Sequence, residues 1–212
     1  TGRSSAETRD IMESANIHSG IFMNGQVVLY QEQVIYSSQI PTETVEKFHQ
    51  MVNEDGYGLT AYNHEQFYLV ASSEGAKDAY GFIHTNPPAL KEDFYKNHPI
   101  NMMLFICLPP AEEKYKEAFP PLDFLRNTPY SVDVISKGNS KAEGIKRFLE
   151  YLNQEDAETF AFGDGPNDIE MLQNAGLSYA VSNSRPEVQA AAKDTCPPYW
   201  ENGVLQILRS FL

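Results

Sequence analysis

The sequence predicts an α/β protein with a doubly wound, mostly parallel, Rossmann-like core and a smaller α+β module inserted into it. Two observations predict this architecture. From residue 130 onward, apolar strand-like runs alternate regularly with amphipathic helical stretches, which is typical of a parallel sheet covered by helices. Between residues 38 and 128, hairpin signals and helices follow without that alternation. We therefore expect residues 1–37 and 129–212 to form the core and residues 38–128 to form the inserted module.

The first 37 residues are expected to contain a helix and a small antiparallel sheet. Weak helical periodicity runs through residues 1–16, with Ser4 and Ser5 as candidate N-caps. Asn24-Gly25, the strongest short hairpin signal in the chain, separates two β-prone runs, and Val34–Tyr36 predicts a third strand. We attribute Asn24 entirely to this turn.

The inserted module is expected to hold its own helices and strands. Residues 72–98 lack clear periodicity and contain Pro87-Pro88, so we expect a long loop there with at most one short helix. The other expected elements are a helix from Pro41 to Gly56, a hairpin of Tyr57–Tyr62 with Gln66–Ala71, a buried strand at Met102–Leu108 and a weak helix at Glu112–Phe119.

Regular alternation of strands and helices is expected in the last third of the chain. The strands are Tyr130–Ile135, Thr159–Phe162 and Leu177–Val181, and the helices are Lys141–Asn153, a helix after Pro166, Pro186–Ala192 and a last helix from Gly203. Ser140 and Glu143 have the spacing of a capping box at the start of the first of these helices.

Three oxygen-bearing side chains gather where the strand Thr159–Phe162 gives way to a helix. Asp164, Asn167 and Asp168 lie within five residues, in a loop that contains Gly163 and Gly165. Strand-to-helix junctions of open α/β sheets are common ligand sites. The side chains could instead only cap the helix, but two neighbouring carboxylates repel unless a cation lies between them. Oxygen ligands of this kind suit Mg²⁺, which takes only one or two carboxylates from a protein.

Composition excludes several classes of function. The formal net charge of −13 argues against nucleic-acid binding and against attraction to an anionic membrane. No stretch approaches the length of a membrane-spanning helix, and the two cysteines, Cys107 and Cys196, fit a reducing cytoplasm. The chain begins at Thr1-Gly2-Arg3 rather than at a methionine, and we expect it to be a fragment or a processed product.

Lys141 is expected in the first turn of its helix, where the helix dipole disfavours a cation by about 0.3–1 kcal/mol. A solvated lysine tolerates that position, so solvent exposure alone would explain Lys141 and the nearby Lys137. An anion held in front of the helix would give Lys141 a function, and the acidic junction at Asp164 lies in the next strand–loop–helix unit along the chain.

The segments 137–144 and 162–176 together resemble the third and fourth motifs of the Cof-type branch of the haloacid dehalogenase superfamily. Thr1-Gly2-Arg3 resembles the second motif of that branch, and Ala180–Asn183 resembles its C-terminal pattern. The order and spacing of these segments fit over the full chain. The resemblance implies a haloacid dehalogenase-like fold and a Mg²⁺-dependent phosphatase of small phosphorylated metabolites, such as sugar phosphates.

The same resemblance implies roles for individual residues. The phosphoryl group would be bound by Thr1, Arg3, Lys141 and Asn167. Of these, Thr1 and Lys141 would also be catalytic residues. Asp164 and Asp168 would serve the metal, and Asp164 would bind it directly. The module 38–128 would be a cap that closes over the substrate and selects it.

One part of the family pattern is missing. The superfamily's first motif, an Asp-x-Asp segment that carries the nucleophile, has no counterpart in these residues, and Asp133 has no acidic partner two positions on. We therefore expect the chain to be inactive by itself and to self-associate through a sheet that lacks its central strand. The alternatives are a non-catalytic relative that binds a phosphorylated ligand or a partner, a phosphosugar mutase of the superfamily, and a structural Mg²⁺ site.

Overall fold

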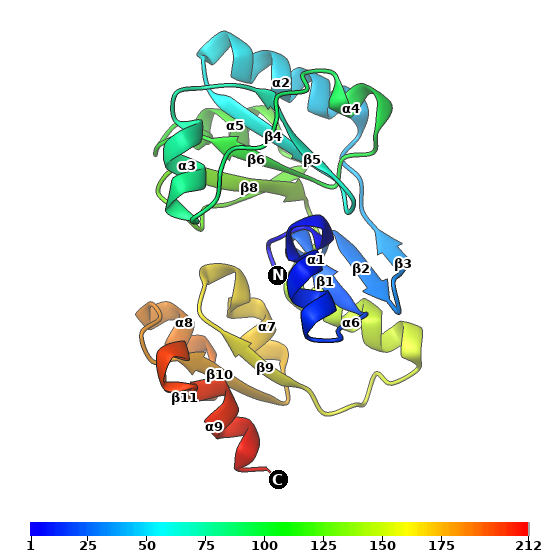
Figure 1. Cartoon of the computed structure of the whole chain (residues 1–212), viewed down its shortest axis with the longest axis vertical. Coiled ribbons are helices and arrows are strands. Elements are labelled where there is room, and N and C mark those ends of the chain that lie inside the picture. Colours follow the sequence, from blue (N-terminus) through cyan, green and yellow to red (C-terminus); the bar gives the residue numbers. More distant parts are fainter. Residues whose placement is uncertain (212) are drawn as a thin grey trace. The chain divides into compact units, whose positions relative to one another are not determined.

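The computed structural model describes residues 1–211 and divides the chain into two compact units, Thr1–Asn139 and Ser140–Leu212. Both units mix helices and strands (Figure 1). Of the helices in residues 1–211, none has the length and the apolar character that a membrane crossing requires.

The first unit begins with a capped helix and a three-stranded antiparallel sheet. Helix α1 starts after Ser4, whose hydroxyl accepts a hydrogen bond from the Glu7 backbone N–H while the Glu7 carboxylate accepts one from the Ser4 N–H. These reciprocal bonds form a capping box. The elements of this region are α1 (Ser5–Ser14), β1 (Gly20–Phe22), a 3-10 turn (Met23–Gly25), β2 (Val27–Tyr30) and β3 (Gln33–Ser37), in the order β1-β2-β3.

The predicted Asn24-Gly25 hairpin is present, with φ of 55° and 90° at these two residues. The turn does not fully explain Asn24, however, because its side chain is buried and donates a hydrogen bond to Asp133 Oδ2 at 2.9 Å. Our attribution of Asn24 to the turn alone is therefore wrong.

A five-stranded antiparallel sheet of order β5-β4-β6-β8-β7 forms the rest of the first unit. One face packs against α2, α4 and α5 around Phe48, Phe105 and Tyr115, and α3 packs on the other face through Tyr80. The elements are α2 (Thr42–Asp55), β4 (Gly58–Tyr62), β5 (Phe67–Ala71), α3 (Ala76–Phe82), α4 (Phe94–Asn97), β6 (Met102–Ile106), α5 (Glu112–Ala118), β7 (Leu122–Leu125) and β8 (Ser131–Ser136).

This sheet differs from the sequence-based expectation in three respects. Residues 72–98 contain two helices, α3 and α4, where at most one was expected, and β7 was not predicted. Strand β8 pairs antiparallel with both β6 and β7, so it belongs to this sheet, beside the edge strand β7, rather than opening a parallel one. The expected boundary at residue 128 therefore falls between two paired strands of this sheet, β7 and β8. The sequence did not reveal this pairing, because the partners of a strand are set by long-range packing.

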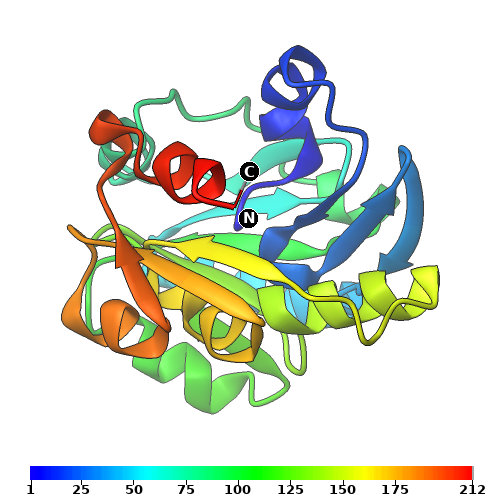
Figure 2. The ribbon, with the colours of Figure 1, turned by 90° about the horizontal axis from the view of Figure 1, so that it is seen from below.

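The second unit is a three-stranded parallel sheet of order β11-β10-β9 with helices on both sides. Helices α7 and α8 lie on one face, and α9 lies on the other (Figure 2). Leu172, Ala180 and Val188 form the centre of its core. The elements are α6 (Lys141–Leu152), β9 (Phe160–Gly163), a 3-10 turn (Pro166–Asp168), α7 (Ile169–Asn174), β10 (Leu177–Val181), α8 (Pro186–Ala191), β11 (Asp194–Cys196), a second 3-10 turn (Tyr199–Glu201) and α9 (Gly203–Arg209).

Candidate functional site

Helix α6 positions Lys141 at its first residue. Ser140 is the N-cap, and its hydroxyl accepts a hydrogen bond from the Glu143 backbone N–H at 3.1 Å. This is the serine half of the expected capping box. The cap fixes the point at which the helix begins, and therefore the direction from which the Lys141 side chain leaves it.

The loop after β9 is folded around the carboxylate of Asp168. Its Oδ2 atom accepts hydrogen bonds from the backbone N–H groups of Asp164 and Gly165, both at 3.0 Å. The loop is so tight that a Cβ atom on Gly163 would lie 2.6 Å from the Asp168 Cβ. A glycine is therefore needed where β9 ends, because any side chain there would displace Asp168.

Lys141 and Asp168 form an ion pair that is almost completely buried. The distance from Lys141 Nζ to Asp168 Oδ1 is 2.6 Å, and the two side chains are 12% and 6% exposed. Burial acts to raise the pKa of the Asp168 carboxyl, but the Lys141 ammonium and the two backbone N–H groups outweigh it and hold the pKa below its usual value. The carboxylate is therefore charged at neutral pH, and it holds the Lys141 ammonium at the edge of the loop.

Asp164 differs from Asp168 in having an exposed carboxylate. In the described part of the chain no hydrogen bond or ion pair joins its side-chain oxygens to another residue. Its oxygens are thus available to a cation, whereas both oxygens of Asp168 already have partners. Asn167, half-buried in the same loop, adds an amide oxygen to the donor set.

This donor set fits Mg²⁺ in part. Mg²⁺ is held by one or two carboxylates and keeps several waters, so Asp164 supplies a suitable anchor. Within residues 1–211, no group of three or more His, Cys, Asp or Glu side chains is placed to hold a metal ion. Asp168 would have to give up Lys141 or the backbone N–H groups to become a direct ligand. The expected metal pair, Asp164 and Asp168, stays a prediction.

Thr1 and Arg3 belong to the first compact unit, whereas the other four expected site residues belong to the second. The Thr1 ammonium donates a hydrogen bond to the Ile21 carbonyl at 2.9 Å, and the Thr1 hydroxyl accepts one from the Arg3 backbone N–H at 3.1 Å. Both side chains are exposed. Their assembly with Lys141 into one site stays a prediction.

Sequence reasoning missed a polar cluster on the five-stranded sheet. Asp133 Oδ2 accepts hydrogen bonds from the side-chain amides of Asn24, at 2.9 Å, and Asn127, at 3.1 Å. The available signal was an aspartate between Val132 and Val134 in an otherwise apolar strand. A charged residue in such a position needs hydrogen-bond partners, which here come from the Asn24 turn, 109 residues away, and from the connection between β7 and β8.

Comparisons with known proteins bear on the family and the fold of the chain. A family model described as haloacid dehalogenase-like hydrolase matches residues 1–208. A Bacillus subtilis (strain 168) protein named "Putative phosphatase YkrA" is 33% identical over 205 residues, which cover 96% of this chain and 79% of that protein.

Two solved structures have the same fold over 100% of this chain and 83% of theirs. A hypothetical protein from Geobacillus kaustophilus HTA426 gives a TM-score of 0.90 at 28% identity. The subclass IIB sugar phosphatase BT4131 gives 0.86 at 27% identity. The fold class and the family resemblance predicted from the sequence are confirmed: the chain belongs to the haloacid dehalogenase-like hydrolase family.

Proposed function

We propose that the protein is a Mg²⁺-dependent phosphatase of small phosphorylated metabolites. The observation that carries the proposal is the buried Lys141–Asp168 pair beside the exposed carboxylate of Asp164, in a chain of this hydrolase family. Phosphoryl transfer needs positioning and charge neutralisation more than elaborate covalent chemistry. A held cation and a metal anchor supply both.

Each residue has a distinct part in this mechanism. Lys141 neutralises the phosphoryl oxygens, and Asp168 keeps its ammonium in place so that little reorganisation is needed when substrate binds. Asp164 would hold Mg²⁺, and Asn167 would contact either the metal's surroundings or the phosphate. The metal, when bound, neutralises the remaining phosphoryl charge. For Thr1 and Arg3 we keep the expectation that they bind the phosphoryl group.

Hydrolysis through an aspartyl-phosphate would need a nucleophilic aspartate that these 212 residues do not contain, because they include no Asp-x-Asp segment. We infer that these residues alone bind a phosphorylated ligand without turning it over. This observation also favours the second candidate function, a non-catalytic relative that binds a phosphorylated ligand.

The substrate class rests on similarity and on the inserted module. BT4131 is a sugar phosphatase, and we propose a sugar phosphate or a similarly small metabolite here. We further propose that the module expected at residues 38–128 acts as a cap over the substrate. The free, buried thiols of Cys107 and Cys196 support a reducing, cytoplasmic location for the protein.

Self-association is a further part of the proposal. Strand β9 is the last strand in the order β11-β10-β9, and Phe160 in that strand is 41% exposed. A strand with an open edge and an exposed aromatic side chain tends to pair with another chain. Light scattering of the 212-residue chain should reveal species larger than a monomer, and a monodisperse monomer would contradict this part.

The test is hydrolysis of p-nitrophenyl phosphate with and without Mg²⁺. The 212-residue chain should be inactive, and the same chain joined before Thr1 to a strand that carries Asp-x-Asp should gain Mg²⁺-dependent activity. In that active form, Asp164→Ala should lower kcat by at least about 100-fold, as expected when a main source of charge neutralisation is lost. Glu170→Gln, an exposed change on the adjacent helix, is the matched control and should leave the activity unchanged.

A further inference from the structure

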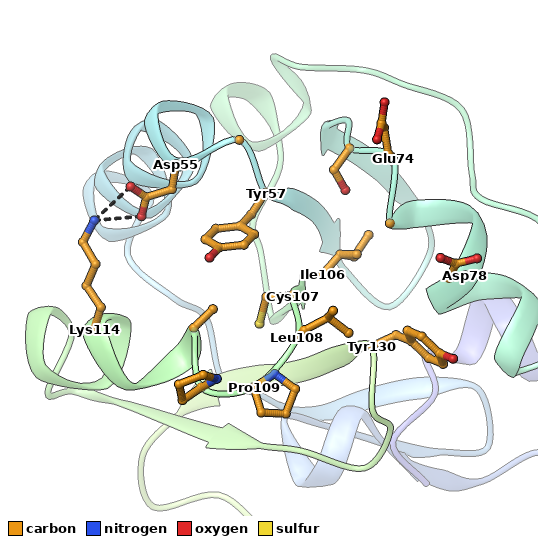
Figure 3. A pocket seen from close by; sticks show the side chains of 15 residues that line it. Asp55, Tyr57, Glu74, Asp78, Ile106, Cys107, Leu108, Pro109, Lys114 and Tyr130 are labelled. Atoms are coloured by element: carbon orange, nitrogen blue, oxygen red, sulfur yellow. Dashed lines mark hydrogen bonds and ion pairs between the residues drawn. The ribbon is translucent and has the colours of Figure 1, made fainter.

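A cavity of about 870 Å³ lies within the first unit and is lined by residues between Asp55 and Tyr130 (Figure 3). It is bounded by the end of α2, the starts of β4, α3 and α5, and the end of β6. A volume of this size is within the range of sites for small organic molecules. Neither the motifs nor the proposed phosphatase chemistry uses it.

The one ammonium group that lines this cavity is already neutralised. Lys114 Nζ lies 2.9 and 2.8 Å from the two carboxylate oxygens of Asp55, and the Tyr115 hydroxyl donates to the same carboxylate at 2.9 Å. Hydrogen bonding to Lys114 and to Tyr115 holds the pKa of Asp55 below its usual value. A phosphate or other anion would have to draw Lys114 away from both Asp55 oxygens, and no second cation is among the lining residues that the structure describes, which argues against a second phosphoryl site.

Two carboxylates at the other end of the cavity have no such partner. Glu74 and Asp78 lie across the cavity from the Asp55–Lys114 pair (Figure 3), and both are exposed. No ion pair or hydrogen bond joins either side chain to another residue in the part of the chain that the structure describes. The lining thus carries three carboxylates against one ammonium, and the surplus negative charge is at one end.

The walls between the two ends are apolar and aromatic. Tyr57 and Tyr130 contribute rings, and Leu108 is 60% exposed although it is a large apolar residue. The Ser73 hydroxyl, which also lines the cavity, is buried and has no hydrogen-bond partner among the described residues. Buried polar groups are nearly always hydrogen-bonded, so this hydroxyl indicates a partner that the chain does not supply.

We propose that this cavity binds an organic cation, with its ammonium group at the Glu74 and Asp78 carboxylates and its apolar part against Tyr57 and Leu108. Carboxylates and tyrosine rings both attract a cation, the rings through their negative faces. The apolar part of the ligand covers Leu108, and a polar atom near the ammonium end pairs with the Ser73 hydroxyl. The proposal does not depend on the phosphatase function.

A purely structural role is the competing explanation for these carboxylates. Glu74 lies just before the N-cap of α3 and Asp78 lies in its first turn, where negative charge is favoured by the helix dipole. That role predicts a loss of stability when both carboxylates are removed. It predicts no preference of the cavity for a cation over a neutral molecule of the same shape.

The test is calorimetric titration of the full chain at low ionic strength with 2-phenylethylammonium and with its neutral counterpart, 2-phenylethanol. The ammonium compound should bind at least tenfold more tightly than the alcohol, and Glu74→Gln/Asp78→Asn should abolish this preference. Glu92→Gln/Asp93→Asn removes the same two charges from exposed positions outside the cavity and should retain it. Equal binding of the two compounds by the unmodified chain, or an equal loss in both double variants, would overturn the proposal.

A second pair of variants covers the case in which Glu74→Gln/Asp78→Asn fails to fold. Because Leu108 is exposed, Leu108→Lys and Leu108→Gln should both keep the fold, as circular dichroism can verify. Leu108→Lys brings a cation into the cavity and should lower the affinity for 2-phenylethylammonium at least tenfold more than Leu108→Gln does. Equal effects of the two substitutions would contradict a cation site.

Discussion

Replacing Asp168 by asparagine should destabilise the protein strongly, although the change removes only a charge. The side chain is 6% exposed, and its two oxygens accept from Lys141 at 2.6 Å and from two backbone N–H groups at 3.0 Å. Asparagine can still accept from the backbone with its one oxygen, but its NH₂ group then faces the Lys141 ammonium. Removing one partner of a buried ion pair costs about 3–5 kcal/mol. Because Lys141 is 12% exposed and can turn toward water, we expect about 3 kcal/mol.

Urea unfolding followed by circular dichroism measures this loss. Asp164→Asn is the matched control, because it makes the same chemical change in the same loop, at an exposed carboxylate to which residues 1–211 offer no hydrogen bond or ion pair. It should change the free energy of unfolding by less than about 0.5 kcal/mol. Lys141→Met combined with Asp168→Asn should cost less than the sum of the two single losses by at least about 1 kcal/mol. A loss below about 1 kcal/mol for Asp168→Asn, or additivity in the double variant, would refute the pairing.

Three further predictions concern stability and thiol reactivity. The Arg126 guanidinium, hydrogen-bonded to the buried Glu112 carboxylate at 2.6 and 2.7 Å, holds the pKa of Glu112 below its usual value. This pair therefore stabilises the fold above the unfolded-state pKa of about 4.3 and loses that effect as the pH falls through the lower folded-state pKa. Glu112→Gln should lower the free energy of unfolding by about 3 kcal/mol at pH 7 and by much less at pH 3. Equal shifts of the urea midpoint at pH 7 and pH 3 would contradict this prediction. Gly203→Ala should lower the free energy of unfolding by about 3 kcal/mol or more, because the added Cβ would lie 1.7 Å from the Pro197 carbonyl oxygen. Gly81→Ala, inside α3, is the control: its added Cβ has no atom within 4 Å, and it should stabilise the protein by about 0.5–1 kcal/mol in thermal unfolding. Burial raises the pKa of the Cys107 thiol to about 11 and also raises the pKa of the Cys196 thiol. Neither thiol should react with a thiol reagent at pH 8 until urea unfolds the chain. Rapid labelling of the folded protein would contradict this prediction.

Local sequence patterns predicted much of the fold. The Asn24-Gly25 hairpin, the helix that ends at Gly56 and the strand–loop–helix unit around Asp164 all appear where they were expected. Each depends on interactions between near neighbours, such as positive φ angles at a turn or a left-handed residue after a helix. Such signals can be read directly from adjacent residues.

The elements that were missed are short or depend on distant partners. Strands β7 and β11 have four and three residues, too few for a clear alternation of apolar and polar positions. Helices α3 and α4 have seven and four residues, and α3 is held by the packing of Tyr80 against the sheet rather than by its own periodicity. The place of β8 between β6 and β7 is a pairing across the fold, about which its own residues contain no information.

The same limit applies to the candidate site. The sequence identified Lys141, Asp164 and Asp168, but their types alone do not say which carboxylate binds the lysine and which is left for a cation. That division follows from the tight turn at Gly163, which presents the Asp168 carboxylate to two backbone N–H groups and to a lysine 27 residues away. Contacts over such a separation become visible only in the folded unit.

The most direct test of the account is the dependence of phosphatase activity on Lys141 and Asp164. The chain joined to a strand that carries Asp-x-Asp should hydrolyse p-nitrophenyl phosphate only with Mg²⁺. Lys141→Met and Asp164→Ala should each lower kcat by at least about 100-fold, while Glu170→Gln leaves it unchanged. Mg²⁺-dependent hydrolysis that survives both substitutions would contradict the assignment of this loop as the phosphoryl-transfer site.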